Sequence, residues 1–424
     1  MTESLRARVA VVGAGPAGIA AAAMAAEAGS NVVLLDEAPS PGGQIWRPGS
    51  RSRVPPSARQ WIDRLGRSGA RLISEATVVD ADSPLRLVVS RRQERLEVQA
   101  ERVVLAMGSR ELFLPFPGWT LPGVLGVGGA QALSKTGVRF RDRRVVIAGS
   151  GPLLLPVAAA LARDGAQLIT VAEQASRRSV MGFALGLWRQ PSKLLEAGSL
   201  RAAFATTSYR TGVWVERAHG AEMVSSVTLT DGSRSWTQAC DILCSSYGLV
   251  PNVELALWLG CTLQDGAVYV DDDQVTSMDG VLCAGEPTGI GGSDLALVEG
   301  QIAGLVAVGE RSTLSSLKRR RSALQRIACR MEVGFRPRPE LLHRLEGTTK
   351  VCRCEDVGWD ELDTVTNLRQ AKLYTRVGMG PCQGRVCGAA LQLLKGWRAD
   401  KVRSPLKPCR VGELLTQDSI GDAG

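Results

Sequence analysis

The stretch RVAVVGAGPAGIAAAAMAAEAGSNVVLLDEAPSPGG, residues 8–43, decides the fold. It predicts a strand, a glycine turn, a helix of small residues and a second strand that ends at Asp36. Gly13 permits the tight turn, Gly15 lets the backbone approach a pyrophosphate, and Gly18 allows close packing of helix on strand. The helix N-terminus would face the phosphates, and Asp36 would bind a ribose hydroxyl. Together these features predict a dinucleotide-binding fold.

Residues 144–173, RVVIAGSGPLLLPVAAALARDGAQLITVAE, repeat this pattern. Gly149 and Gly151 fill the first two glycine positions, whereas Leu154 takes the third, where it would push helix and strand apart. Glu173 is the nearest acid at the end of the second predicted strand. The fold of this unit is clear, but its ligand stays open between NAD(P), another adenine nucleotide and none, and the altered third position argues against NAD(P).

Composition narrows the class of protein. A chain of 424 residues exceeds one hydrophobic core, so several domains are expected. The net charge of +9 is mild for this length, and no nucleic-acid motif or basic stripe with aromatics occurs, so we expect no nucleic-acid partner. Only two histidines are present, which disfavours a histidine-based triad or a Rieske-type cluster.

Targeting and membrane signals are also weak. The apolar N-terminal stretch is interrupted by glycines at nucleotide-binding spacing, so we do not interpret it as a signal peptide. No other stretch approaches the roughly 20 apolar residues that a membrane span needs. Because the cysteines show no pairing framework, we expect a cytoplasmic protein, with peripheral attachment to the inner face of a membrane as a variant of that expectation.

Four cysteines near the C-terminus carry a second chemical signal. Cys352 and Cys354 form a C-x-C arm, and Cys382 and Cys387 form a C-x₄-C arm. Thiolates hold both iron–sulfur clusters and structural zinc. Zinc sites favour C-x₂₋₄-C on both arms, so the tight C-x-C arm favours a cluster, with zinc as the alternative. Glycines around the second arm would leave backbone N–H groups free to bond cluster sulfurs.

No cysteine precedes Cys240, so the chain lacks the redox dithiol that disulfide reductases carry beside their flavin. Further along, apolar residues recur at spacings of three, four and seven: Leu314, Leu317, Leu324, Ile327 and Met331. They predict an amphipathic helix whose other face is basic, with Lys318, Arg319, Arg320, Arg321, Arg326 and Arg330. That basic face is either a docking face for a partner protein or a solvated surface.

Three motifs resemble those of the two-dinucleotide-domain flavoproteins related to glutathione reductase. They are the first fingerprint, VVLAMGSRE (103–111) and GVLCAGEPTGIGG (280–292). In the last motif, Glu286 stands where the family has aspartate and would reach one methylene further towards a ribityl hydroxyl. The resemblance implies an FAD site made of Gly13, Gly15, Pro16, Ala17, Gly18, Asp36, Glu37, Gly43, Gln44, Arg47, Val78, Ala106, Met107, Gly108, Gly285 and Glu286.

The cysteine arms resemble the bacterioferritin-associated-ferredoxin-like [2Fe–2S] domain. The whole combination resembles the alpha-type subunits of amino- and imino-acid dehydrogenase complexes. Examples are the A subunits of octopine and nopaline oxidase, the alpha subunits of hydroxyproline and proline dehydrogenase, and the B subunit of hydrogen cyanide synthase. This resemblance implies FAD and a [2Fe–2S] cluster in the chain and an FMN at an interface between subunits. It further implies a D-amino-acid-oxidase-like catalytic partner, a further small subunit, and an electron acceptor such as a quinone.

We therefore predict an α/β protein with two Rossmann-like domains, the second inserted in the first, and a small, mainly α iron–sulfur domain. The predicted boundaries are 1–117 and 256–310 for the FAD-binding domain, 118–255 for the inserted domain, 311–346 for the basic helix and linker, and 347–424 for the [2Fe–2S] domain.

The leading functional hypothesis is an electron-transfer subunit, because the chain shows no substrate base, no redox dithiol and an altered second fingerprint. Two alternatives stay open. One is a stand-alone NAD(P)H-dependent FAD and iron–sulfur oxidoreductase that takes hydride at Gly149 and Gly151. The other is an assembly subunit whose cofactors are structural.

Overall fold

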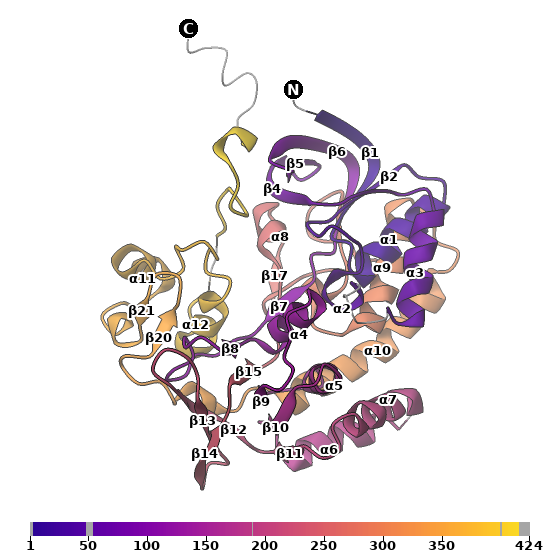
Figure 1. Cartoon of the computed structure of the whole chain (residues 1–424). Coiled ribbons are helices and arrows are strands. Elements are labelled where there is room, and N and C mark those ends of the chain that lie inside the picture. The colour runs from indigo at the N-terminus through magenta and orange to yellow at the C-terminus, as the bar shows by residue number, and fades with distance from the viewer. Residues whose placement is uncertain (1–2, 48–53, 189, 399–400, 415–424) are drawn as a thin grey trace.

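The computed structural model describes residues 3–47, 54–188, 190–398 and 401–414. It confirms the predicted α/β fold with two nucleotide-binding domains, drawn one above the other in Figure 1, and a smaller C-terminal module lies beside them. Within these ranges, no helix combines the length and the apolar character that crossing a membrane requires.

The first domain is built on a parallel sheet in the order β3, β2, β1, β6, with β19 on the far side of β6. An antiparallel extension, β4 and β5, pairs with the first half of β6. The strands are β1 (Glu3–Val12), β2 (Val32–Leu35), β3 (Arg71–Ile73), β4 (Ala76–Ser83), β5 (Arg86–Arg91), β6 (Glu94–Leu105) and β19 (Val281–Cys283). Every residue of β2 and β19 is buried, as expected for parallel strands covered on both faces.

Three helices cover one face of this sheet: α1 (Pro16–Glu27), α3 (Pro56–Arg67) and α9 (Ser293–Ala307). α1 is mostly alanine, so α9 can approach its backbone directly. A Cβ atom at Gly300 of α9 would lie 2.1 Å from the Ala17 carbonyl oxygen, so only glycine fits there. The opposite face is covered by β4, β5, the short helix α8 (Glu254–Trp258) and part of the C-terminal tail.

The second domain has a parallel sheet in the order β11, β10, β9, β15, β8 and a separate antiparallel sheet of β12, β13 and β14. Its strands are β8 (Val124–Leu125), β9 (Arg144–Gly149), β10 (Gln167–Glu173), β11 (Ser208–Thr211), β12 (Trp214–His219), β13 (Ser226–Thr230), β14 (Ser235–Ala239) and β15 (Ile242–Ser246). Its helices are α4 (Val127–Lys135), α5 (Leu154–Arg163), α6 (Arg177–Gly186) and α7 (Pro191–Ala202).

The chain crosses between the two domains at β7 (Ser109–Glu111) and β16 (Leu249–Pro251), which pair with each other antiparallel. The helix after the second glycine turn starts late. α1 begins directly after Gly15, whereas α5 begins only at Leu154, the third residue after Gly151. Leu154 is buried in the core of this domain, so the helix starts where the leucine packs rather than next to the glycines.

The predicted amphipathic helix is α10 (Leu314–Phe335), which packs on α9 and α6. Part of its basic face is internal, since Arg321 is buried and lies 2.6 Å from Asp272, and Lys318 lies 2.5 Å from Asp273. The remaining basic side chains, Arg319, Arg320, Arg326 and Arg330, are exposed.

The C-terminal module contains β20 (Lys350–Cys352), β21 (Val357–Gly358), α11 (Leu368–Thr375) and α12 (Cys387–Lys395) around a small core of its own. From residue 401 the chain leaves this module and returns to the first domain, as the yellow segment in Figure 1 shows. There the Leu406 amide donates to the Val79 carbonyl at 2.7 Å, and the Leu406 side chain is buried in the first core.

Candidate functional site

The first glycine turn brings together segments that lie far apart in the sequence. The Gly13 amide donates to the Leu35 carbonyl at 2.8 Å, and the Ala106 amide donates to the Val12 carbonyl at 2.8 Å. A Cβ atom at Gly18 would lie 1.7 Å from the Gly13 carbonyl oxygen, so helix and turn pack backbone on backbone. No described atom lies within 4 Å of a Cβ at Gly15, which leaves that face of the turn open to a phosphate.

The loop that contains Gly42 and Gly43 lies against this turn. The Gly42 amide donates to the Ala14 carbonyl at 2.8 Å, and a Cβ at Gly43 would lie 3.0 Å from the Gly15 Cα. Asp36 joins the two segments, because its carboxylate accepts from the Ala14 amide at 2.5 Å and from the Ala38 amide at 2.8 Å. Burial raises the pKa of Asp36, partly offset by these two N–H groups.

The remaining predicted FAD residues lie in the segment after β2, after the end of β6 and in β4. Arg47 donates to the Gln44 side chain at 2.8 Å, and Glu37 pairs with Lys407 of the returning tail at 2.9 Å. Met107 and Gly108 follow Ala106 at the carboxyl end of β6. Val78 is buried in β4, within the core of the first domain.

The late flavin motif closes the site from the α9 side. A Cβ at Gly285 would lie 2.8 Å from that of Ala17, so the two motifs touch. Glu286 turns its carboxylate to its own loop, where it accepts from the Gly292 amide at 2.8 Å and the Gly291 amide at 3.3 Å. The Glu286 carboxylate is therefore already bonded to the loop before α9. Its contact with a ribityl hydroxyl stays a prediction.

Two residues of this region carry no signal in the sequence. Glu299 is buried in α9 and accepts from the Gly285 amide at 2.9 Å and the Thr288 hydroxyl at 3.1 Å; burial raises the pKa of Glu299 to about 7. Lys135 of the second domain donates to the Gln44 carbonyl at 2.7 Å. The hydrogen bonds of Glu299 and Lys135 join residues about 14 and about 90 positions apart in the chain. No local sequence pattern reveals such contacts.

The second glycine turn is also hydrogen-bonded to an acid, the buried Glu173. Glu173 is fully buried and accepts from the Gly151 amide and the Ala175 amide, each at 2.8 Å. Burial raises the pKa of Glu173 to about 7. Like Asp36, this carboxylate accepts one N–H group from the glycine turn and one from the residue two positions further along the chain.

The chain itself covers this second turn. The Ser150 hydroxyl donates to the carbonyl of Phe335, the last residue of α10, at 2.7 Å, and the Phe335 side chain lies 3.9 Å from a Cβ at Gly151. Gln174 donates to the Arg336 carbonyl at 3.0 Å and accepts from the Arg338 amide at 3.2 Å. Gly149, Gly151 and Glu173 thus lie together at this turn, and segment 335–338 lies across it. Their binding of a nucleotide stays a prediction.

The four C-terminal cysteines converge in two pairs. Cys352 and Cys387 are buried and joined by a side-chain hydrogen bond, which lowers the pKa of Cys352 to about 5 and raises that of Cys387. Cys354 and Cys382 lie closer to the surface. The pKa of Cys354 is raised, mainly by burial and to a lesser extent by a hydrogen bond with the Cys382 side chain. All four are free thiols.

The backbone around these cysteines suits a thiolate-bound group. After the Cys387 side chain, the backbone amides of Gly378, Glu355 and Cys354 also act to lower the pKa of Cys352. A Cβ at Gly380 would lie 2.3 Å from the Cys354 Cβ, so this glycine is required by the close approach of the two arms. Across the described part of the chain, no group of three or more His, Cys, Asp or Glu side chains is arranged as a formed metal site. The donor set fits a cluster or zinc, and either remains a prediction.

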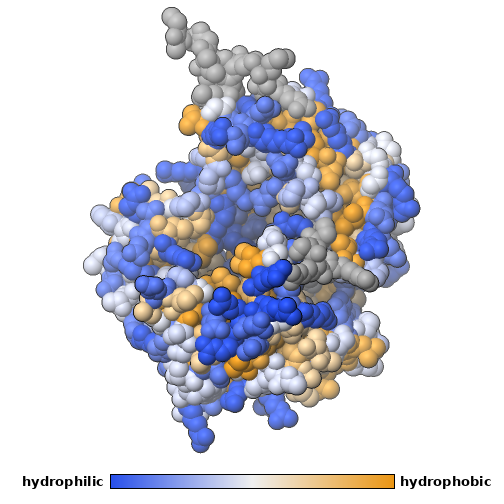
Figure 2. Space-filling model, in the orientation of Figure 1, coloured by the Kyte–Doolittle hydropathy of each residue, from blue (hydrophilic) through white to orange (hydrophobic). Residues whose placement is uncertain are grey.

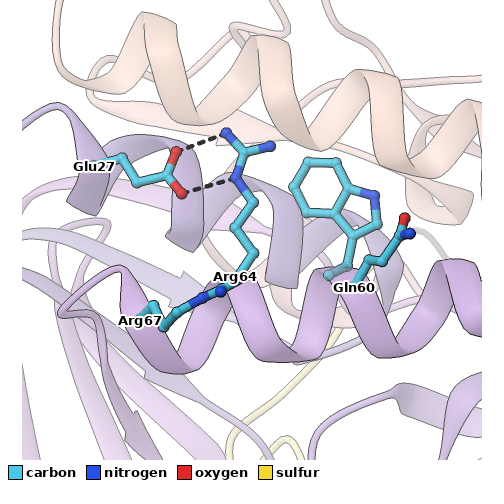
Figure 3. A pocket seen from close by; sticks show the side chains of 5 residues that line it. Glu27, Gln60, Arg64 and Arg67 are labelled. Atoms are coloured by element: carbon cyan, nitrogen blue, oxygen red, sulfur yellow. Dashed lines mark hydrogen bonds and ion pairs between the residues drawn. The ribbon is translucent and has the colours of Figure 1, made fainter.

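An open hollow of about 620 Å³ lies elsewhere, lined by Glu27, Gln60, Trp61, Arg64 and Arg67 (Figure 3). It lies at the C-terminal end of α1, whereas the glycine turn lies at the N-terminal end. Arg64 spans it, paired with Glu27 at 2.6 Å and stacked 4.8 Å from the centre of the Trp61 ring. This hollow contains none of the predicted site residues.

With this geometry established, comparison with known proteins identifies the family. A family model described as pyridine nucleotide-disulphide oxidoreductase matches residues 7–303. The chain belongs to this family. It is an oxidoreductase, and family membership supports the predicted FAD at the first glycine turn.

The resemblance to alpha-type subunits is also confirmed. The chain is 32% identical to the A subunit of opine oxidase from Rhizobium meliloti (strain 1021), covering 95% of this chain and 97% of that protein. It is 32% identical to the HcnB subunit of hydrogen cyanide synthase from Pseudomonas aeruginosa, covering 90% of each. The structure of L-proline dehydrogenase from P. horikoshii matches with a TM-score of 0.70 at 21% identity over 98% of this chain and 81% of that one, which shows a shared fold.

The first glycine turn yields a matched pair of variants. Gly15→Ala should fold normally but bind FAD on the order of tenfold more weakly, because the added methyl group meets no protein atom yet faces the expected pyrophosphate. Gly18→Ala should lower stability by roughly 3 kcal/mol, since its methyl group collides with backbone. Flavin content and thermal unfolding of the apoprotein separate the two effects; equal loss of stability in both variants would contradict this account.

The raised pKa of Glu173 predicts that the stability of the fold depends on pH. Its folded pKa, about 7, lies above the ordinary value of 4.5, so the protonated form is favoured in the native state. The stability that this contributes is fully present below pH 4.5 and is lost as the pH rises through 7. Relative to Glu173→Gln, the wild type should therefore lose up to about 3 kcal/mol between these values. Urea unfolding of both proteins across this range checks the slope, and parallel curves would refute it.

Proposed function

We propose that this chain is the FAD- and [2Fe–2S]-containing electron-transfer subunit of a dehydrogenase complex that oxidises an amino acid, an imino acid or an opine. A D-amino-acid-oxidase-like partner removes two electrons and two protons from the carbon–nitrogen bond. The electrons pass singly through the cysteine-held cluster and the FAD to an acceptor such as a quinone, whose reduction takes up two electrons and two protons. An FMN at the interface with the partner and a further small subunit belong to the same proposal, as does a cytoplasmic location or attachment at the inner membrane face.

One observation carries the proposal: the four cysteines lie in two pairs within one module of a pyridine nucleotide-disulphide oxidoreductase. Backbone amides near Cys352 act to lower its pKa, which suits a sulfur that binds a cluster as thiolate. A cluster carries one electron at a time, which suits a flavin protein that hands electrons to another carrier. The names of the relatives support the same role, since each is a subunit of an oxidase or a synthase.

The cover over the second glycine turn argues against the main alternative. A stand-alone NAD(P)H oxidoreductase needs that turn open to the pyrophosphate. Here the Phe335 carbonyl and the Arg336 carbonyl are bonded to Ser150 and Gln174 across it. Hydride entry at this point would first require segment 335–338 to leave.

The function is tested by expressing the chain with and without a D-amino-acid-oxidase-like partner from the same source. We expect co-purification and dye-linked oxidation of opines or amino acids by the complex, and none by the chain alone. Full amino-acid oxidation by the chain alone would overturn the proposal. Anaerobic bleaching of the flavin by NADH or NADPH would favour the stand-alone enzyme, and a flavin and cluster that no reductant changes would favour an assembly subunit.

The cysteine assignment has its own test. Cys352→Ser, Cys354→Ser, Cys382→Ser and Cys387→Ser should each remove iron, acid-labile sulfide and the visible absorbance beyond the flavin bands, because each removes one of four ligands. Cys329→Ser and Cys409→Ser serve as matched controls, since these thiols lie outside the module core. Bound zinc in place of iron and sulfide would contradict the cluster.

A further inference from the structure

Arg110 links the two parts of the chain that the proposed function makes redox-active. It lies in β7, two residues after Gly108 of the predicted FAD motif. Its Nε donates to the Arg385 carbonyl at 2.9 Å, and Arg385 lies between Cys382 and Cys387. Its Nη1 donates to the Asn252 Oδ1 at 2.8 Å and pairs with the Glu254 Oε1 at 2.9 Å. About three quarters of the side chain is withdrawn from water, with 23% exposed.

Asn252 extends this link to the flavin motif itself. Its Nδ2 donates to the Met107 carbonyl at 2.9 Å, and its backbone amide donates to the Gly108 carbonyl at 3.0 Å. A continuous series of hydrogen bonds therefore runs from Met107 through Asn252 and Arg110 to the backbone of Arg385. The Arg385 amide in turn donates to the Cys382 carbonyl at 3.0 Å.

The charge of Arg110 lies beside the cysteine loop, because its guanidinium is bonded to the backbone of that loop at Arg385. Burial lowers the pKa of Arg110; the carboxylate of Glu254 raises it, and the positive charge of Arg385 lowers it further. An arginine stays protonated in a protein, so this is a fixed positive charge. Because Arg110 is partly buried, water screens its charge less than it screens the charge of Arg376, an exposed arginine of the cysteine module that is paired with Glu355 at 2.7 Å.

We propose that Arg110 and Asn252 form the electron-transfer junction between the flavin domain and the cysteine module. Arg110 raises the reduction potential of the group that the four cysteines hold, because adding one electron to that group increases its negative charge. Asn252 holds the flavin motif against the arginine. Both are positioning residues. This inference rests on the proposed function, in which a reduced flavin and a one-electron carrier exchange two electrons in two single transfers, with the protons exchanged at the flavin.

The charge is tested by redox titration of the full chain carrying FAD and cluster, followed by electron paramagnetic resonance. Arg110→Met should lower the cluster potential by about 59 mV, which is tenfold in a one-electron equilibrium. Glu254→Gln should raise it, because a negative charge beside the arginine is removed. Arg110→Lys should stay near the wild type, and Arg376→Met, the exposed control, should shift it little. Shifts of the same sign in the Arg110→Met and Glu254→Gln variants, or none, would overturn the role of the charge.

The link is tested by Asn252→Ala, which breaks the series without altering charge. After photochemical reduction of the flavin under anaerobic conditions, electron transfer to the cluster should slow at least tenfold, while the potential stays unchanged. An unchanged rate would remove Asn252 from the junction. A wild-type chain that holds no cluster would instead refute the proposed function, so the two failures are distinguishable.

Discussion

Backbone packs directly on backbone at the first glycine turn, and the rest of the flavin-binding region depends on that contact. A Cβ at Gly18 would lie 1.7 Å from the Gly13 carbonyl oxygen, and a Cβ at Gly13 would lie 2.4 Å from the Ala106 carbonyl oxygen. Three peptide segments therefore share a space that side chains would fill. This contact places the end of β6, the start of α1 and the loop of Gly42 and Gly43 at the carboxyl edge of one sheet. Ligands bind at this edge in folds of this kind.

The two glycine turns share one hydrogen-bonding arrangement but differ in how far they are buried. In each, the acid that terminates the second strand accepts a backbone N–H from the turn: Asp36 from Ala14 and Glu173 from Gly151. The first acid is partly exposed beside an open face, whereas the second is fully buried beneath segment 335–338. What differs is the return of α10 across the second domain. At the second turn, hydrogen bonds from Ser150 and Gln174 thereby join segment 335–338 to the second domain.

The space-filling view in Figure 2 shows a largely hydrophilic face over the three parts of the molecule, with apolar areas scattered between. The parts are joined by polar groups and also by a shared apolar cluster, to which Trp214 of the second domain, Leu341 of the linker and Ala390 of the cysteine module contribute. Arg344 of the linker donates to the Val215 and Leu114 carbonyls, and the Trp119 indole donates to the Lys350 carbonyl. Arg110 belongs to the same class of contact. These bonds, together with the apolar packing of α12, align the cysteine module on the paired strands β7 and β16.

The sequence by itself determined the two nucleotide-binding folds, the positions of the glycine turns, the helix from Leu314 and the family. Each depends on local backbone geometry or on spacing within a short segment. Local pattern could not show that Glu286 bonds its own loop, that Glu299 lies buried behind it, or that Arg321 of the basic helix is internal. Only the tertiary structure decided that Phe335 covers the second turn and that Arg110 reaches the cysteine loop, because their partners lie about 185 and 275 residues away in the chain. Such contacts follow from how separately folded parts pack, which residue spacing does not encode.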